Sequence, residues 1–159
     1  MTEVDPALVP PGAKFDHVAH AAHRIAELLP LYRDALGGRF TSGDDNLEQG
    51  YRTLHITYGD GSKIELLEPL AGSHFLDSFF ARHPHGGLHH VTFRVADLDL
   101  ALAGATAAGL EVFGFNRDRP KWHEFFIHPR GAGGVLVQIA QAADDFPPPA
   151  TVSIEEFLA

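Results

Sequence analysis

The chain has no cysteine and no run of about 18 apolar residues, the length that a membrane-spanning helix needs. The absence of cysteine excludes disulfides and thiolate metal sites, and it is compatible with a reducing cytoplasm, where we expect this protein. The first residues carry Glu3 and Asp5 and form no apolar segment. We therefore expect neither a signal peptide nor association with a membrane.

Basic residues are also few. Lysine and arginine number 12 against 21 aspartates and glutamates, which gives a formal charge of −9 at pH 7. This balance argues against nucleic acid as a partner, because phosphate binding needs a basic surface. The apolar content of 45% is enough for a normal core, so 159 residues predict one ordinary domain or two small modules. Histidine is plentiful: the 11 histidines form a large pool of nitrogen ligands.

The most informative feature is an internal repeat with an offset of 73 residues (90 minus 17). Phe15-Asp16-His17-Val18 aligns with Leu88-His89-His90-Val91, and the segment 61–66 aligns with 134–139. At the same offset His55 falls on His128. Identity between the halves is low, so it is the constant register that indicates two copies of one supersecondary unit.

Each copy is predicted to contain a strand, a helix and three further strands. In the first copy we expect a strand over 15–21, a helix that ends at Gly37-Gly38 with Pro30 in its first turn, a short strand over 39–41, a polar loop over 42–49, and hairpin strands over 51–58 and 63–68. In the second copy we expect strands over 88–95, 112–115, 124–128 and 135–140, and a helix from Asp97 to Gly109. A short helix around 75–81 and a last helical turn capped by Ser153 complete the prediction.

The predicted fold class is therefore α+β, built from two pseudo-symmetric βαβββ modules. A lead-in over 1–14 precedes the first module, 15–69, and a connector over 70–86 precedes the second, 87–141. The Pro-rich tail, 142–159, is expected to dock either on its own domain or on a partner subunit.

The repeat brings four polar donors to equivalent strand positions: His17, Glu65, His90 and Gln138. Two imidazoles, a carboxylate and an amide oxygen suit a divalent ion such as Co, Mn, Ni, Zn or Fe. A lone strand histidine is usually a satisfied core residue, but the fixed offset favours metal binding. Glu65 supports the same hypothesis, because a carboxylate between Ile64 and Leu66 is costly to bury without a partner.

Four segments carry a family resemblance: Phe-Asp-His-Val-Ala from Phe15, Lys-Ile-Glu-Leu-Leu-Glu-Pro from Lys63, Gly-Leu-His-His-Val-Thr-Phe from Gly87, and His-Pro-Arg-Gly-Ala-Gly-Gly-Val-Leu-Val-Gln from His128. Together they resemble the vicinal oxygen chelate (glyoxalase/bleomycin resistance/dioxygenase) superfamily, and within it the branch of methylmalonyl-CoA epimerases and glyoxalases. The resemblance covers roughly residues 15–141. It implies paired modules whose mixed sheet curls around a divalent metal, and it also implies a homodimer.

The resemblance also implies roles for single residues. His17, Glu65, His90 and Gln138 fall on the four ligand positions, which is the set that the repeat gives. Glu48 lies in Glu48-Gln49-Gly50, which resembles the loop where the epimerases carry a catalytic glutamate.

Two positions depart from the epimerase pattern. The fourth ligand position is usually a glutamate that acts as one of two acid/base groups, whereas Gln138 cannot exchange a proton near neutral pH. Glu65 then takes over as the second base, or Glu48 acts alone, or the epimerase activity is absent. Lys121-Trp122-His123 is the second departure, since the epimerases have small residues there.

We therefore expect a metal-dependent isomerase, epimerase or lyase that stabilises an enolate of a small carbonyl or acyl-CoA substrate, with Glu48 and Glu65 as the catalytic residues. One alternative is a non-catalytic small-molecule (antibiotic) binding protein of the same fold, and another is a ring-cleaving dioxygenase. Four basic residues near the second hairpin are candidates to meet a CoA phosphate, although a solvated face is their ordinary role: Arg117, Arg119, Lys121 and Arg130.

Overall fold

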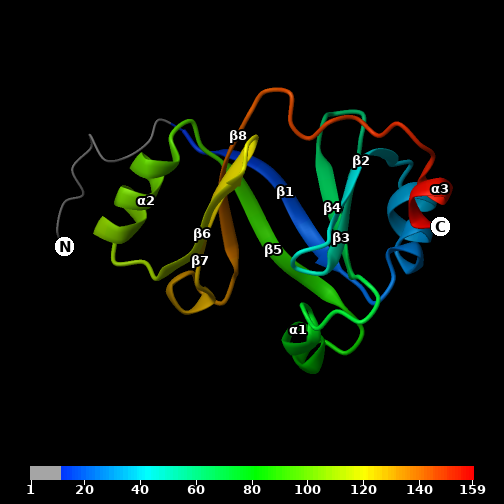
Figure 1. Ribbon diagram of the computed structural model, residues 1–159, viewed down its shortest axis with the longest axis horizontal. Helices are drawn as coiled ribbons and strands as arrows, with labels where there is room; N and C mark the ends of the chain where they lie inside the picture. The colour runs from blue at the N-terminus through cyan, green and yellow to red at the C-terminus, as the bar shows by residue number, and fades with distance from the viewer. Residues whose placement is uncertain (1–11) are drawn as a thin grey trace. The chain divides into compact units, whose positions relative to one another are not determined.

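The structure is a computed structural model that describes residues 12–159, so most of the predicted lead-in lies outside the described residues (Figure 1). The chain divides into two compact units. The N-half unit consists of His17–His89 and Pro147–Ala159, and the C-half unit consists of residues 12–16 and His90–Phe146. No helix within residues 12–159 is long and apolar enough to cross a membrane.

The N-half unit contains a four-stranded mixed sheet in the order β2-β3-β4-β1. Its strands are β1 (Lys14–Ala21, the first three residues of which belong to the C-half unit), β2 (Arg39–Asn46), β3 (Tyr51–Thr57) and β4 (Lys63–Pro69). Its helices are η2 (Ile25–Glu27), η3 (Pro30–Ala35), α1 (Asp77–Arg82) and α3 (Ile154–Leu158). Strands β1 and β4 are parallel, and the other neighbours are antiparallel.

The C-half unit repeats this arrangement in the order β5-β8-β7-β6. Its strands are β5 (Gly87–Arg94, which starts in the N-half unit), β6 (Val112–Arg119), β7 (Trp122–Ile127) and β8 (Val137–Ala142). Helix α2 (Leu98–Ala107) packs on β6, β7 and β8, and the short η4 (Pro129–Gly131) follows β7. The predicted α+β class with two βαβββ modules and mixed strand pairing is confirmed.

The internal repeat is present in the register of the central strands. Val18 lies opposite Ile64 in the first parallel pair, and Val91 lies opposite Val137 in the second. Ala19 opposite Glu65 and Thr92 opposite Gln138 follow the same rule. Every one of these positions is related by the 73-residue offset (91 minus 18) that the sequence predicted.

The offset fails along the hairpin strands β3 and β7. Glu65 lies opposite His55 on β3, whereas Gln138 lies opposite Phe126 on β7 and not opposite His128. The connection from β7 to β8 is longer and contains η4, and this shifts the hairpin register. His128 caps η4 instead, its Nδ1 accepting a hydrogen bond of 3.1 Å from the backbone N–H of Arg130. The alignment of His55 with His128 is therefore wrong.

Three further differences concern element boundaries. The helix expected before Gly37 is split into η2 and η3, and Pro30, which cannot donate a helical hydrogen bond, opens the second piece. The expected polar loop over 42–49 is strand as far as Asn46, because a β-bulge between Phe40 and Ser42 lets β2 continue its pairing with β3. Strand β6 extends to Arg119, past its expected end at 115.

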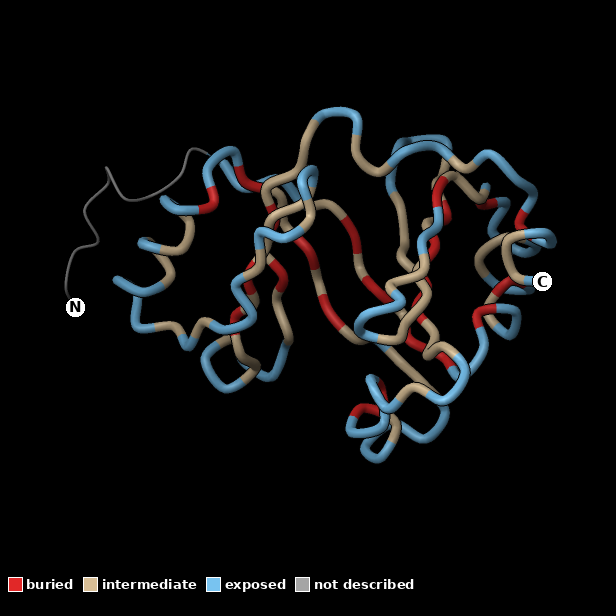
Figure 2. The backbone as a smooth tube through the Cα atoms, in the orientation of Figure 1, coloured by how far each residue is buried: buried red, intermediate tan, exposed pale blue. Residues whose placement is uncertain are grey.

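The alternation of side chains along β3 and β4 separates an apolar face from a polar one. Leu54, Ile56 and Leu66 belong to the buried core cluster that also contains Ile25 of η2 and Ile154 of α3. Figure 2 colours the buried residues of the chain red. Since neighbouring side chains on a strand point to opposite faces, His55 and Glu65 lie on the other face of the same two strands. The core therefore fixes the direction of the polar residues.

The C-terminal tail docks on its own unit, which is one of the two expected outcomes. The backbone N–H of Ala150 donates to the carbonyl of Thr41 at 2.8 Å, and Ile154 enters the core. The Ser153 hydroxyl caps α3 as predicted. The Phe157 ring lies beside Gly43, where a Cβ atom would come within 2.7 Å of the ring. The tail therefore holds β2 in place next to its bulge.

We predict that Phe157→Ala destabilises the protein by about 2–3 kcal/mol, somewhat less than the loss of a fully buried phenylalanine, because the ring is only partly buried. Urea denaturation measures the difference in unfolding free energy. Val152→Ala is the control, since Val152 is exposed in the same tail and its loss should leave stability nearly unchanged. Equal stability of the Phe157→Ala protein and the parent would contradict tail docking.

Candidate functional site

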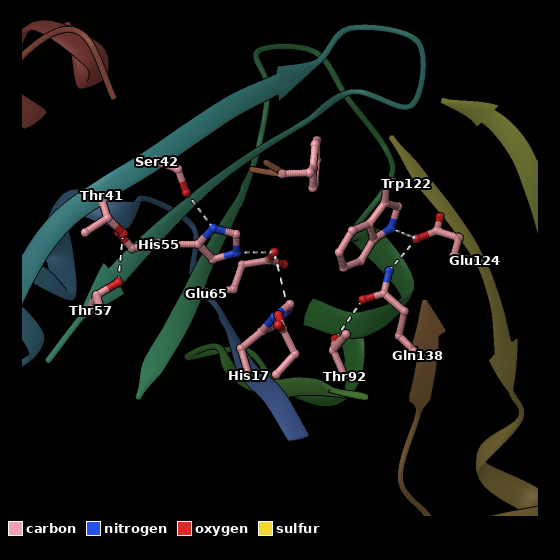
Figure 3. Close-up of polar contacts among 12 residues, drawn as sticks. His17, Thr41, Ser42, His55, Thr57, Glu65, Thr92, Trp122, Glu124 and Gln138 are labelled. Atoms are coloured by element: carbon pink, nitrogen blue, oxygen red, sulfur yellow. Dashed lines mark hydrogen bonds and ion pairs between the residues drawn. The ribbon is translucent and has the colours of Figure 1, made fainter. Parts of the chain in front are cut away.

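A cluster of three polar side chains lies on the polar face of the N-half sheet (Figure 3). Glu65 Oε2 is 3.5 Å from His17 Nε2 and 3.2 Å from His55 Nε2. One ligand atom from each residue lies within 4.8 Å of the other two. Solvent reaches only 2% of the His17 side chain and 13% of the other two, so the cluster is nearly closed to water.

Strand pairing accounts for this arrangement. His55 lies directly opposite Glu65 on the antiparallel neighbour, so their side chains share one face. Ala19 lies opposite Glu65 on the parallel neighbour, and His17 stands two residues before Ala19 on the same face. Three adjacent strands thus supply one side chain each.

The His55 ring is held from its far side. Ser42, buried at the β-bulge, places its Oγ 2.7 Å from His55 Nδ1, which leaves Nε2 directed at Glu65 (Figure 3). The rings of His17 and His55 lie 5.3 Å apart, centroid to centroid. A hydrogen bond at one ring nitrogen fixes both the orientation of a histidine and the nitrogen that remains for other partners.

His89 also lies within reach of the Glu65 charge. Burial lowers the pKa of the His89 imidazole, and the negative charge of Glu65 opposes this by a smaller amount. Its ring packs against Phe79 at a centroid distance of 5.0 Å. His89 is therefore a packed histidine that favours the neutral form, as expected for a structural residue.

In the C-half unit, Gln138 belongs to a separate hydrogen-bond network. Its Oε1 accepts from the Thr92 hydroxyl at 2.7 Å, and its Nε2 donates to Glu124 Oε2 at 2.5 Å. The Trp122 indole N–H donates to the same carboxylate oxygen at 2.6 Å (Figure 3). A carboxylate only accepts hydrogen bonds, so the amide nitrogen of Gln138 must face Glu124 and its oxygen must face Thr92. His90 is buried on β5, two residues before Thr92 and on the same face.

The structure brings together two of the four predicted ligands in one unit, His17 and Glu65. His90 and Gln138 both belong to the C-half unit, on neighbouring strands. The four-residue ligand set, which combines residues of both units, stays a prediction.

Glu48, the predicted loop base, is exposed in the turn between β2 and β3. It lines an open groove together with residues that include Leu47, Ser73 and His74. Among the described residues, none of His17, His55 and Glu65 lines this groove. The strand from Tyr51 to His55 spans about 13 Å, so the turn lies well away from Glu65 along β3.

The basic residues near the second hairpin are occupied by acidic neighbours. Arg117 pairs with Asp99, Lys121 with Asp145, and Arg130 with Glu111. All three pairs lie at the surface, in agreement with a solvated face. A role for these residues in binding a CoA phosphate stays a prediction.

Sequence reasoning missed His55 and Glu124. The signal for His55 was available, because a hairpin around Gly59-Asp60-Gly61 with Thr57 opposite Lys63 also sets His55 opposite Glu65. No comparable signal identified Glu124, because its partner Gln138 lies across a hairpin whose register departs from the repeat.

Comparison with known proteins gives one family and a consistent set of relatives. Residues 16–126 match the family described as the glyoxalase/bleomycin resistance protein/dioxygenase superfamily. The ethylmalonyl-CoA/methylmalonyl-CoA epimerase of Cereibacter sphaeroides is 30% identical over 131 residues, which cover 80% of this chain and 97% of that protein.

Solved structures agree with this result. The methylmalonyl-CoA epimerase of Mycobacterium tuberculosis is similar with a TM-score of 0.72 and 27% identity, over 83% of this chain and 89% of that one. A methylmalonyl-CoA epimerase solved with methylmalonyl-CoA and NH4+ gives a TM-score of 0.71 at 27% identity, over 83% and 96% of the two chains.

We predict that Glu124→Ala destabilises the protein by about 1–3 kcal/mol, because the donors of Trp122 and Gln138 then lose their shared acceptor. Trp122 is the single tryptophan, so its fluorescence reports on this site directly. The emission spectrum should shift in Glu124→Ala and change much less in Glu124→Gln, which keeps an acceptor oxygen. Identical spectra and equal urea midpoints for Glu124→Ala and the parent would show that the network contributes nothing.

Proposed function

The chain belongs to the glyoxalase/bleomycin resistance protein/dioxygenase superfamily, and we propose that it is a divalent-metal-dependent epimerase acting on an acyl-CoA related to methylmalonyl-CoA. The observation that carries this proposal is the His17–Glu65 pair, a nearly closed imidazole–carboxylate donor set in a chain whose relatives include epimerases. The reaction would remove the proton beside the thioester carbonyl and return it from the opposite side.

The donor set fits a divalent ion. An ion bound at about 2.1 Å holds neighbouring donor atoms roughly 3.0–3.4 Å apart, depending on its geometry. The separations of 3.5 Å and 3.2 Å from Glu65 to the two histidines lie close to that range. When bound, the ion would supply Lewis acidity toward the oxygens of the substrate. His17 and Glu65 would hold it, and the predicted set adds His90 and Gln138.

Two glutamates of the chain have proposed roles in the reaction. Glu48 is proposed as the base because the family resemblance gives it that role. Its exposed carboxylate lies outside the metal cluster, so this role requires the turn between β2 and β3 to approach the bound substrate. Glu65 would contribute the single negative charge among the ligands. This charge lowers the cost of holding the ion while leaving a net charge near +1 to stabilise an enolate. The sequence also left open that Glu65 acts as the second base. In that role Glu65 would have to exchange a proton while it faces two histidines.

One observation favours a second candidate function. Two histidines and one carboxylate form the donor set of non-haem iron(II) oxygenases, and His17, His55 and Glu65 match it. A ring-cleaving dioxygenase therefore remains the alternative enzyme. Oxygen uptake with a catechol by the iron(II)-loaded protein would favour it over the epimerase. Tight binding of a small molecule without turnover would instead favour the binding-protein alternative.

We predict that the metal-loaded protein exchanges the α-proton of methylmalonyl-CoA for deuterium in D2O, as followed by mass spectrometry. Removal of the ion with a chelator should abolish exchange, and added Co²⁺ or Mn²⁺ should restore it. Glu48→Gln should slow exchange by about 10²–10⁴-fold, the usual contribution of a general base. Glu27→Gln, which changes an exposed glutamate elsewhere in the N-half unit, is the matched control. A loaded protein that exchanges no deuterium would overturn the proposed function.

A further inference from the structure

We propose that His55 is a metal ligand, so that the N-half unit alone offers three donors to the ion: His17, His55 and Glu65. The inference rests on the metal dependence in the proposed function. It goes beyond the set given by the repeat and by the family resemblance, since neither takes a ligand from β3.

The first argument is geometric. The three ligand atoms lie within 4.8 Å of one another, and Glu65 Oε2 is closer to His55 Nε2 than to His17 Nε2. Any ion that binds the His17–Glu65 pair would therefore lie within reach of the His55 ring. The donors also come from three adjacent strands whose register fixes their spacing. Only small side-chain movements are needed to bring all three around one ion.

The second argument concerns the partner of His55. Metal-bound histidines ordinarily donate their other ring N–H to a hydrogen-bond acceptor, which fixes the tautomer and the ring orientation. Ser42 Oγ lies 2.7 Å from His55 Nδ1 and can accept that hydrogen bond. Without the ion, His55 Nε2 donates to Glu65 Oε2 at 3.2 Å. A bound ion would take the place of that proton, and His55 would then carry its proton on Nδ1 and donate it to Ser42.

The local backbone is built to hold this partner. Ser42 is buried at the β-bulge of β2, and the preceding Thr41 pairs with Thr57 through hydroxyl oxygens 2.8 Å apart. The C-terminal tail bonds to the Thr41 carbonyl. Ser42 is therefore held in place through its neighbour Thr41, as expected for a residue that orients a ligand.

The C-half unit lacks the equivalent donor. Phe126 lies opposite Gln138 where His55 lies opposite Glu65. The amide of Gln138 is engaged by Thr92 and Glu124. Of the two pseudo-symmetric positions, only the N-half one carries an imidazole, so the third donor is specific to this half.

The test is Co²⁺ binding by equilibrium dialysis, with the d–d absorption of bound Co²⁺ as a second readout. His55→Phe should bind Co²⁺ at least roughly a hundredfold more weakly than the parent, a loss larger than that of an orienting residue. It should also change the absorption spectrum at saturating Co²⁺. The variant places at this position the residue that the C-half sheet already carries, so the hairpin should fold. His23→Phe, a stacked histidine in the same unit, is the control and should bind as the parent does.

Ser42→Ala provides an independent variant that leaves every proposed ligand in place. It should weaken Co²⁺ binding by about 10–100-fold, as the loss of an orienting partner does. Parental affinity and spectrum in both His55→Phe and Ser42→Ala would overturn the assignment, as would a parent protein that binds no Co²⁺. A parent that binds Co²⁺ through His55 but exchanges no α-proton would overturn the epimerase function and leave the ligand assignment standing.

Discussion

The N-half site depends on one constraint: the carboxylate of Glu65 is held on a β-strand with little access to water. Removing a charged carboxylate from water costs several kcal/mol unless nearby groups compensate for it. Here the compensation comes from His17 and His55, each within 3.5 Å of one carboxylate oxygen. An ion at the same place would compensate more fully, because it brings two positive charges to a site with one negative ligand. The polar face of the sheet is thus arranged around a charge that needs partners.

The remainder of the N-half unit keeps those partners in place. Leu54, Ile56 and Leu66 anchor β3 and β4 in the core, and strand alternation then directs His55 and Glu65 away from it. The β-bulge brings Ser42 to the back of the His55 ring. The tail, which is distant in sequence, packs Phe157 against the neighbouring Gly43. The strands that pack the core of this unit on their apolar face therefore also set the positions of His55 and Glu65 on their polar face.

Much of this fold could be predicted, because its signals are local. Strand alternation, the Asp97 and Ser153 caps and the glycine turns all depend on residues close in sequence, and the structure bears them out. The 73-residue offset correctly predicted that the two halves are equivalent, and the registers of the two parallel pairs are related by it, since those strands keep equal lengths of chain between them. Glu124 and the strand character of 42–46 were missed because they depend on a shifted hairpin register and a bulge, which the partner strand decides. His55 was missed because the repeat aligned it with His128, although the hairpin turn already set it opposite Glu65. The four-residue ligand set remains a prediction for a related reason, as no local pattern fixes how the two units meet.

Equivalent positions in the two halves carry a glutamate and a glutamine, and the charge of their neighbours explains the difference. Glu65 and Gln138 occupy the same register position, but the first meets imidazoles and the second meets the carboxylate of Glu124. A glutamate at 138 would put two carboxylates 2.5–3 Å apart, and their repulsion would force one of them to take up a proton. Glutamine avoids this, because its amide N–H satisfies Glu124 while its oxygen accepts from Thr92. Glutamine at position 138 is therefore compatible with the carboxylate of Glu124 on the adjacent strand β7, to which it donates a hydrogen bond.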